Sequence, residues 1–248
     1  MIFPIGDDNS DRTTTPYINY ILIGINIFVF VLLQGLGNNL EFTYSFSTVP
    51  EEIITGKDIV TESETVRDPV TGDRFVMPGL ERTPFSVYLT LISAIFMHGS
   101  IMHIFGNMLY LWIFGDNLEH ALGHIRYLLF YLVCGVLASL AHVVTAFFLD
   151  SNLLIPSLGA SGAISGVLGG YILLFPKRKV RAILLRSVVT IPAYAALGIW
   201  IVFQLISGFL SAGQEGGGVA YGAHIGGFFA GLILIKFFTI GRKNVTPI

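Results

Sequence analysis

The sequence has few charged residues for its length. Only 12% of its 248 residues are charged and 53% are hydrophobic, whereas about a quarter of the residues in a typical soluble domain carry a charge. A soluble globule is therefore excluded as a description of the whole chain. The formal net charge is −2 and there is no basic tail, so we expect no nucleic acid among its partners.

Cysteine and known metal motifs are also scarce. Cys134 is the single cysteine, which excludes an intrachain disulfide and a cysteine-based metal site. The zinc-protease motif HExxH does not occur. His120 and His124 are spaced like metal ligands, but we place them in a polar turn and expect them to be solvated. We predict no metal site and no cofactor.

What the sequence does contain is a series of long apolar segments. A membrane-spanning helix needs about 20 mostly apolar residues, and six segments are plausible spans, so we predict an all-α, polytopic membrane protein. Residues 84–97 are apolar but short, which predicts a re-entrant or interfacial stretch, and residues 115–124 predict a polar turn. The six predicted spans are 17–34, 101–114, 127–149, 156–175, 188–209 and 221–238.

The positions of lysine and arginine orient these helices. The strongest basic cluster lies at 177–186, between the fourth and fifth spans, whereas the short loops 150–157 and 211–218 contain no lysine or arginine. The positive-inside rule then places both termini inside. A secretory signal and an organellar transit peptide are not recognisable at the start, so we expect a bacterial cytoplasmic membrane. The predicted parts are a cytoplasmic segment 1–16 and a membrane domain 17–248, with a long outer loop at 35–84.

Two predicted spans combine a glycine row with one reactive side chain. The fourth span carries Ser161 and the sixth carries His224. Glycines four residues apart share one face of a helix and let another helix approach closely. Because both spans enter the membrane from outside, Ser161 and His224 should lie at a similar depth. The glycines predicted to pack these helices are Gly159, Gly162, Gly166 and Gly170 in the fourth span and Gly227 and Gly231 in the sixth.

The second span adds a third polar group at the same depth. His103 and Asn107 are four residues apart and share a face, and His98 lies just before the span. A serine nucleophile needs a base and donors that hold an oxyanion. His224 is a candidate base, while Asn107, a neutral His103 and the Ser161 amide are candidate donors. The nearby acidic residues lie in loops, so none is placed to complete a Ser-His-Asp arrangement. A Ser-His dyad is therefore the natural interpretation.

Each of these residues also has a simpler explanation. Serines beside glycines commonly hydrogen-bond between packed helices, which applies to Ser161 and still more to Ser165. His103 and Asn107 could join helices, and His142 is expected to be a buried structural histidine. Residue types and depth alone therefore leave catalysis and a polar transport pathway as equal alternatives.

The three motifs together resemble those of the rhomboid intramembrane serine proteases. They are GASG around Ser161, AHIGGFFAG from His224, and HGSIMHIFGN in the second span. The resemblance implies that Ser161 is the nucleophile and His224 the base. It further implies an oxyanion hole of Asn107, His103 and the Ser161 amide, with His98 in support. Residues 211–218 would cap the site, and the substrates would be transmembrane helices of other proteins in the lipid bilayer.

The sequence departs from the family pattern in two places. Ser165 stands where many members carry an aromatic residue that stacks on the base, so another group must orient His224. The Trp-Arg pair often found in the first outer loop is replaced by a long acidic region. The competing hypotheses are a transporter or channel that uses the polar cluster, and an inactive rhomboid-like protein that only binds helices.

Overall fold

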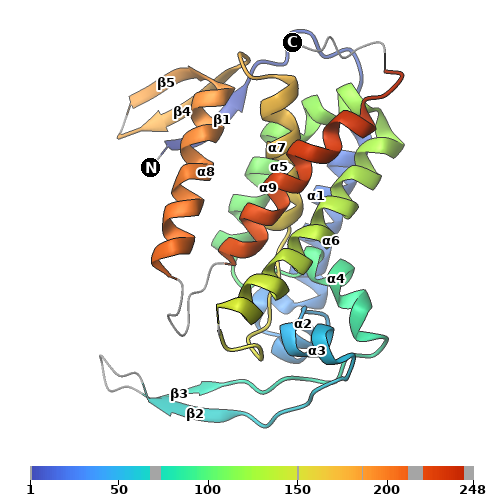
Figure 1. Ribbon diagram of the computed structural model, residues 1–248, viewed down its shortest axis with the longest axis vertical. Coiled ribbons are helices and arrows are strands. Elements are labelled where there is room, and N and C mark those ends of the chain that lie inside the picture. The colour runs from blue at the N-terminus through green and yellow to red at the C-terminus, as the bar shows by residue number, and fades with distance from the viewer. Residues whose placement is uncertain (1, 68–73, 150, 186, 212–219, 243–248) are drawn as a thin grey trace.

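The computed structural model describes residues 2–67, 74–149, 151–185, 187–211 and 220–242. Its long helices run side by side as a bundle, with both ends of the chain at one end of it (Figure 1). We call this the terminal end. The opposite end, where the short helices α2 (Leu40–Ser45) and α3 (Pro50–Thr55) lie, is the loop end. The long helices are α1 (Tyr17–Phe28), α5 (Ile101–Leu122), α6 (His124–Phe148), α7 (Ser161–Leu174), α8 (Ala193–Leu210) and α9 (Tyr221–Phe238).

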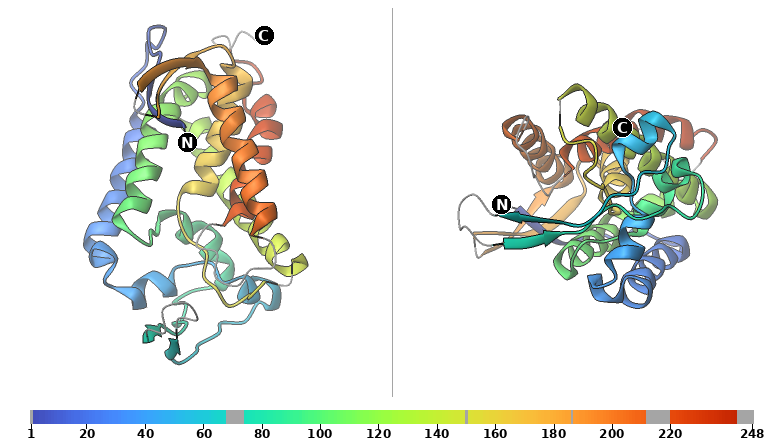
Figure 2. Two further views of the ribbon diagram at one scale, coloured as in Figure 1. Left: turned by 90° about the vertical axis from the view of Figure 1, so that its left-hand side faces the viewer. Right: turned by 90° about the horizontal axis from the view of Figure 1, so that it is seen from below.

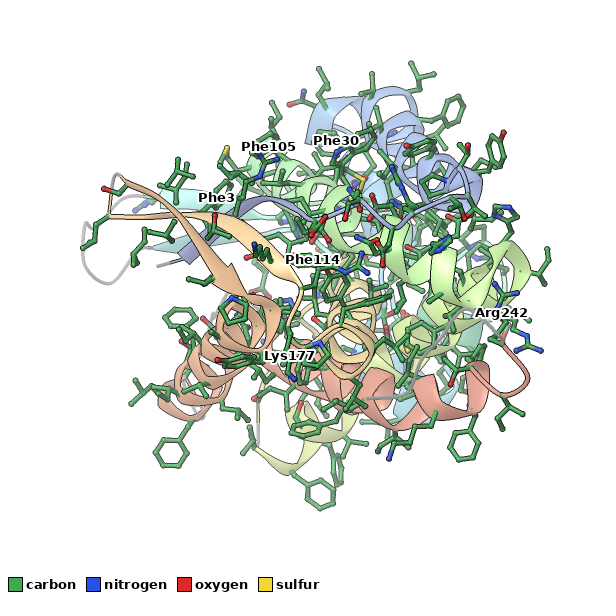
Figure 3. All side chains as sticks on the ribbon, turned by 90° about the horizontal axis from the view of Figure 1, so that it is seen from above. Phe3, Phe30, Phe105, Phe114, Lys177 and Arg242 are labelled. Carbon is green, nitrogen blue, oxygen red and sulfur yellow. The ribbon has the colours of Figure 1, made fainter. Side chains whose placement is uncertain are left out.

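Helix α7 lies at the centre of the bundle. It packs against α5, α6 and α9, and all its residues from Gly162 to Tyr171 are buried. Phe114 of α5 is fully buried and packs edge-on against the Tyr171 ring, with ring centroids 5.0 Å apart. Figure 3 shows Phe114 among the helices and Arg242 at the rim of the bundle. An apolar helix that is buried on every side fits a bundle core and explains why α7 shows no polar face.

Helices α7 and α9 touch along their backbones. A Cβ atom added at Gly227 would lie 2.2 Å from the Gly162 carbonyl oxygen, and one added at Gly231 would lie 2.0 Å from that of Gly166. Glycine is required at both positions because any side chain would push the helices apart. The predicted close approach of these two helices is therefore present.

The glycine row of α7 itself faces another helix. A Cβ atom at Gly162 would meet Ala138, and one at Gly166 would meet Cys134, both on α6. The α7 glycine in closest contact with α9 is Gly169. A Cβ atom added there would lie 2.1 Å from the Phe228 carbonyl oxygen. Small residues on two sides of α7 thus allow α6 and α9 to approach it together.

The predicted polar turn at 115–124 is wrong, because α5 continues as a helix to Leu122. Its polar side chains are buried and find partners. The Glu119 carboxylate accepts hydrogen bonds from the N–H groups of Ile18 and Asn19 at the start of α1. Asp116 pairs with Arg12 at 2.8 Å. A polar stretch does not end a helix when other segments satisfy its side chains.

The predicted start of the fifth span is also wrong, because Val188 lies in a strand. Strands β1 (Ile2–Asp7), β4 (Lys179–Leu184) and β5 (Ser187–Pro192) form an antiparallel sheet in the order β1-β4-β5 at the terminal end (Figure 1). In β4, buried Val180 and Ala182 alternate with exposed Lys179 and Arg181, which is the pattern of a half-buried strand. Helix α8 begins after the strand, at Ala193.

The predicted outer loop contains secondary structure of its own. It holds the short helices α2 (Leu40–Ser45) and α3 (Pro50–Thr55) and a hairpin of β2 (Glu64–Arg67) and β3 (Arg74–Met77). Seen from below, the hairpin extends under the bundle (Figure 2). The fold is therefore mostly helical with two small sheets, and not purely α-helical as predicted.

Several helices have the length and composition of membrane spans. Among the described residues, α6, α8 and α9 qualify singly. Helix α5 qualifies together with the helical turns Val87–Phe96, which include α4 (Thr90–Ser93) and meet it at an 80° bend. Helix α1 with its π-helical continuation, Tyr17–Leu33, and α7 are shorter apolar helices.

Candidate active site

Ser161 is the first residue of α7, so the helix starts later than the predicted Pro156. Just before it, Gly159 adopts a φ of +120°, a conformation that favours glycine, and its N–H donates to the Ala94 carbonyl at 2.8 Å. Gly159 therefore belongs to the turn before the helix and not to the helix-packing row. The N–H groups at a helix start have no acceptor inside the helix, which leaves the Ser161 amide free for a ligand.

The Ser161 hydroxyl meets the His224 imidazole across the contact between α7 and α9. Ser161 Oγ lies 2.8 Å from His224 Nε2, which is a hydrogen-bond distance. If Nε2 accepts the hydroxyl proton, the neutral ring must carry its own proton on Nδ1. This arrangement is that of a nucleophile beside its base.

A third side chain, which the sequence did not reveal, lies next to His224 on the side away from Ser161. Gln204 of α8 places its Oε1 atom 2.8 Å from His224 Nδ1. The Trp200 ring, one turn earlier on α8, lies 6.1 Å from the imidazole, measured between centroids. Ser165 instead donates its hydroxyl to the Ser161 carbonyl at 2.6 Å. The groups that orient His224 thus come from α8 and not from the next turn of α7.

Asn107 and His103 of α5 face the same space. The Asn107 side chain is buried, and its Nδ2 atom has no hydrogen-bond partner among the described residues. His103 Nδ1 lies 3.4 Å from the N–H of Gly99, which donates to it. A neutral imidazole that accepts on Nδ1 carries its proton on Nε2. Both side chains therefore have N–H groups to offer a ligand.

His98 lies behind His103 and does not reach Ser161 directly. Its ring is fully buried and packs edge-on against the His103 ring, with centroids 5.2 Å apart. The Gln34 side chain holds its backbone, accepting from the His98 N–H at 2.9 Å and donating to its carbonyl at 3.0 Å. His98 thus supports the position of His103.

The candidate side chains other than His98 line one cavity of about 810 Å³. The cavity has room for water and for an extended piece of chain. Asp, Glu, Lys and Arg are absent among its described lining residues. His142 of α6, predicted to be a buried structural histidine, also lines the cavity. The candidate site residues that line it are Ser161, His224, Gln204, Asn107 and His103.

Further predictions concern two histidines of the predicted turn, metal binding and the cap. His120 and His124 are not simply solvated, because they contact Thr14 and Glu119 respectively. The described part of the chain holds no cluster of three potential metal ligands. The predicted cap, residues 211–218, lies outside the described residues except for Ser211.

Comparison with known proteins identifies the family of this chain. The family model of the rhomboid domain matches residues 86–240, which include every candidate site residue from His98 to His224. The chain belongs to the rhomboid family. Helix α1 and the whole predicted outer loop, residues 35–84, precede the match in this rhomboid.

Relatives of this rhomboid occur in distant organisms. Rhomboid protein 1, mitochondrial, of Saccharomyces cerevisiae is 28% identical over 216 residues, which cover 86% of this chain and 51% of the relative. The rhomboid protease GluP of Bacillus subtilis is 28% identical over 221 residues, covering 88% of this chain and 35% of the relative. RHOMBOID-like protein 4 of Arabidopsis thaliana is 34% identical over 145 residues, covering 58% and 32%. This rhomboid therefore spans about a third to a half of the length of these relatives.

Proposed function

We propose that this rhomboid is a serine endopeptidase that cleaves transmembrane segments of other membrane proteins. The observation that carries the proposal is the 2.8 Å contact between Ser161 Oγ and His224 Nε2 inside a polar cavity. A serine and a histidine that only joined helices would not need an adjoining space lined with spare N–H donors. A site that performs acyl transfer needs that space for the carbonyl group of its substrate.

The geometry supports a two-step reaction. Ser161 Oγ attacks the peptide carbonyl carbon while His224 Nε2 takes its proton, and the resulting oxyanion accepts hydrogen bonds from Asn107, His103 and the Ser161 amide. His224 then returns the proton to the leaving amine. In the second step His224 takes a proton from a water that attacks the acyl-enzyme, which releases the new carboxyl end and restores the Ser161 hydroxyl.

The proposal includes a membrane topology. Six helices, α1 and α5 to α9, would cross the bilayer with the terminal end in the cytoplasm. Arg12, Arg126, Arg178 and Arg242 would then lie on the inner side, as the positive-inside rule requires. The loop end, which follows α1, would face outside and give the cavity its water. A bacterial cytoplasmic membrane is the proposed location, with residues 1–16 and 17–248 as the cytoplasmic and membrane parts.

Cleavage of a fluorescent single-pass reporter helix in proteoliposomes tests the proposal. We expect the wild type to cut and Ser161→Ala and His224→Ala to be inactive. Ser207→Ala and His120→Ala make the same chemical changes away from the cavity and should cut like the wild type. Equal cutting by wild type and Ser161→Ala would reject the proposal. Solute flux that survives Ser161→Ala, without cleavage by the wild type, would favour a transport pathway.

A further inference from the structure

Gln204 is an unusual residue for its position. It is 6% exposed, and it is polar on a helix whose other buried residues are apolar. A buried amide in an apolar helix costs free energy unless its polar atoms are satisfied. Its Oε1 atom is satisfied by His224 Nδ1, 2.8 Å away. The other buried residues of α8 are Ala193, Ala196, Leu197 and Ile201.

The direction of this hydrogen bond has a chemical consequence. His224 Nε2 can act as a base only in the tautomer whose proton is on Nδ1. A carboxamide oxygen accepts from Nδ1–H, and it stabilises that tautomer against the one with the proton on Nε2. In a Ser-His-Asp arrangement a carboxylate has this role. Here the acceptor is neutral, which avoids the larger cost of burying a charge in a cavity without countercharges.

We propose that Gln204 is the positioning residue of this site: it holds His224 in the tautomer with the proton on Nδ1 and aims Nε2 at Ser161. The inference rests on the proposed function and extends its dyad to a Ser-His-Gln row. Trp200, packed against the imidazole from the same helix, limits ring rotation in the way that an aromatic side chain at position 165 would. Helix α8 thereby takes over the orienting role that Ser165 cannot perform.

The kinetic test uses two substitutions of similar size. Gln204→Met removes the amide acceptor, and we expect kcat to fall about 10- to 100-fold with KM nearly unchanged, as for loss of one hydrogen bond to a group that becomes charged. Gln204→Glu keeps an acceptor and should restore kcat to within a few-fold. Because its carboxylate favours the protonated ring, the pH below which activity is lost should move upward. Leu205→Met, the lipid-facing neighbour, should behave like the wild type.

A spectroscopic test does not depend on activity. In protein labelled with ¹⁵N-histidine, with His224→Ala to assign the signal, we expect wild-type His224 to be protonated on Nδ1 alone. Gln204→Met should give a mixture of tautomers.

The outcomes separate the two proposals. Wild-type kcat in Gln204→Met, or an unchanged His224 signal, would overturn the role of Gln204. So would equal losses in Gln204→Met and Gln204→Glu with a shared drop in thermal stability, because that result is structural. Failure of the proposed function would appear differently, as equal cutting by wild type and Ser161→Ala.

Discussion

Two groups of polar side chains in the molecule differ in how completely their atoms are paired. At the terminal end, charged and amide groups bond to one another in a network that we call the terminal-end network. Arg178, for example, donates to both Asp11 and Asn117. Around the cavity, every side chain is neutral or a histidine, and Asn107 Nδ2 and both ring nitrogens of His98 have no partner among the described residues. The residues of the terminal-end network are Asp7, Asn9, Asp11, Arg12, Asp116, Asn117, Tyr171 and Arg178.

This difference separates a structural role from a chemical one. A buried network stabilises a fold when nearly all of its atoms are satisfied. A site that must bind a developing charge keeps donors available, at a cost in stability. Unsatisfied buried donors beside a nucleophile are therefore a better sign of function than polarity alone.

Two asparagines on α5 test the comparison most strongly. Asn107→Ala removes a spare donor, so we expect kcat to fall about 100- to 1,000-fold with no loss of thermal stability. Asn117→Ala breaks bonds to Asp7 and Arg178, and it should cost about 1–3 kcal/mol of stability while kcat per folded molecule is unchanged. Reporter cleavage and thermal unfolding in detergent measure both. If Asn107→Ala instead lowered stability and Asn117→Ala lowered kcat, the distinction between the two groups would be wrong.

The glycine contacts predict an effect on the fold itself. Gly231→Ala places a methyl group where the Gly166 carbonyl oxygen lies 2.0 Å away, and α7 and α9 must separate to admit it. We expect a loss of about 3 kcal/mol, the upper part of the usual overpacking range, together with reduced cleavage. Gly198→Ala, where a Cβ atom meets nothing within 4 Å, is the matched control. Equal unfolding temperatures for the two variants would contradict the packing described above.

The last prediction concerns the pH dependence of stability and depends on Asp7, a member of the terminal-end network. Burial raises the pKa of Asp7 from 3.8 to about 7, and its Oδ1 atom has no partner among the described residues. The folded state therefore binds a proton that the unfolded state releases between these pH values. The contribution of Asp7 to stability is present below pH 3.8 and is lost as the pH rises through about 7. Asp7→Asn should flatten this part of a plot of unfolding temperature against pH, and an unchanged slope would exclude Asp7 as its cause.

Local sequence patterns were sufficient for most of the helices and for the central pair of residues. The sixth predicted span coincides with α9, a long apolar run between the glycine-rich stretch 211–218 and Gly241-Arg242-Lys243. Ser161 and His224 could be paired because each has glycines on the following turns and both spans run in the same direction. The spacing of residues along each helix and their depth in it are enough to predict this pairing.

The missed features depend on contacts between distant segments. Nothing near Gln204 in the sequence says that α8 turns it towards His224. Strand β4 was hidden because the basic residues of 177–186 indicated a charged loop, although Val180 and Ala182 already alternated with them. Strand β5 was missed because its apolar residues were taken as the start of the fifth span. The helical course of 115–122 depends on partners more than a hundred positions earlier, such as Arg12 for Asp116.

The pairing of β1 with β4 also sets an order for biogenesis. Residues 2–7 are synthesised before their partners at 179–184, which follow only after more than 170 further residues have been made. At typical synthesis rates this interval is on the order of ten to thirty seconds. During that interval the first strand lacks its partner strand. The sheet at the terminal end is thus a late closure of the protein, formed after the serine-bearing helix has been synthesised.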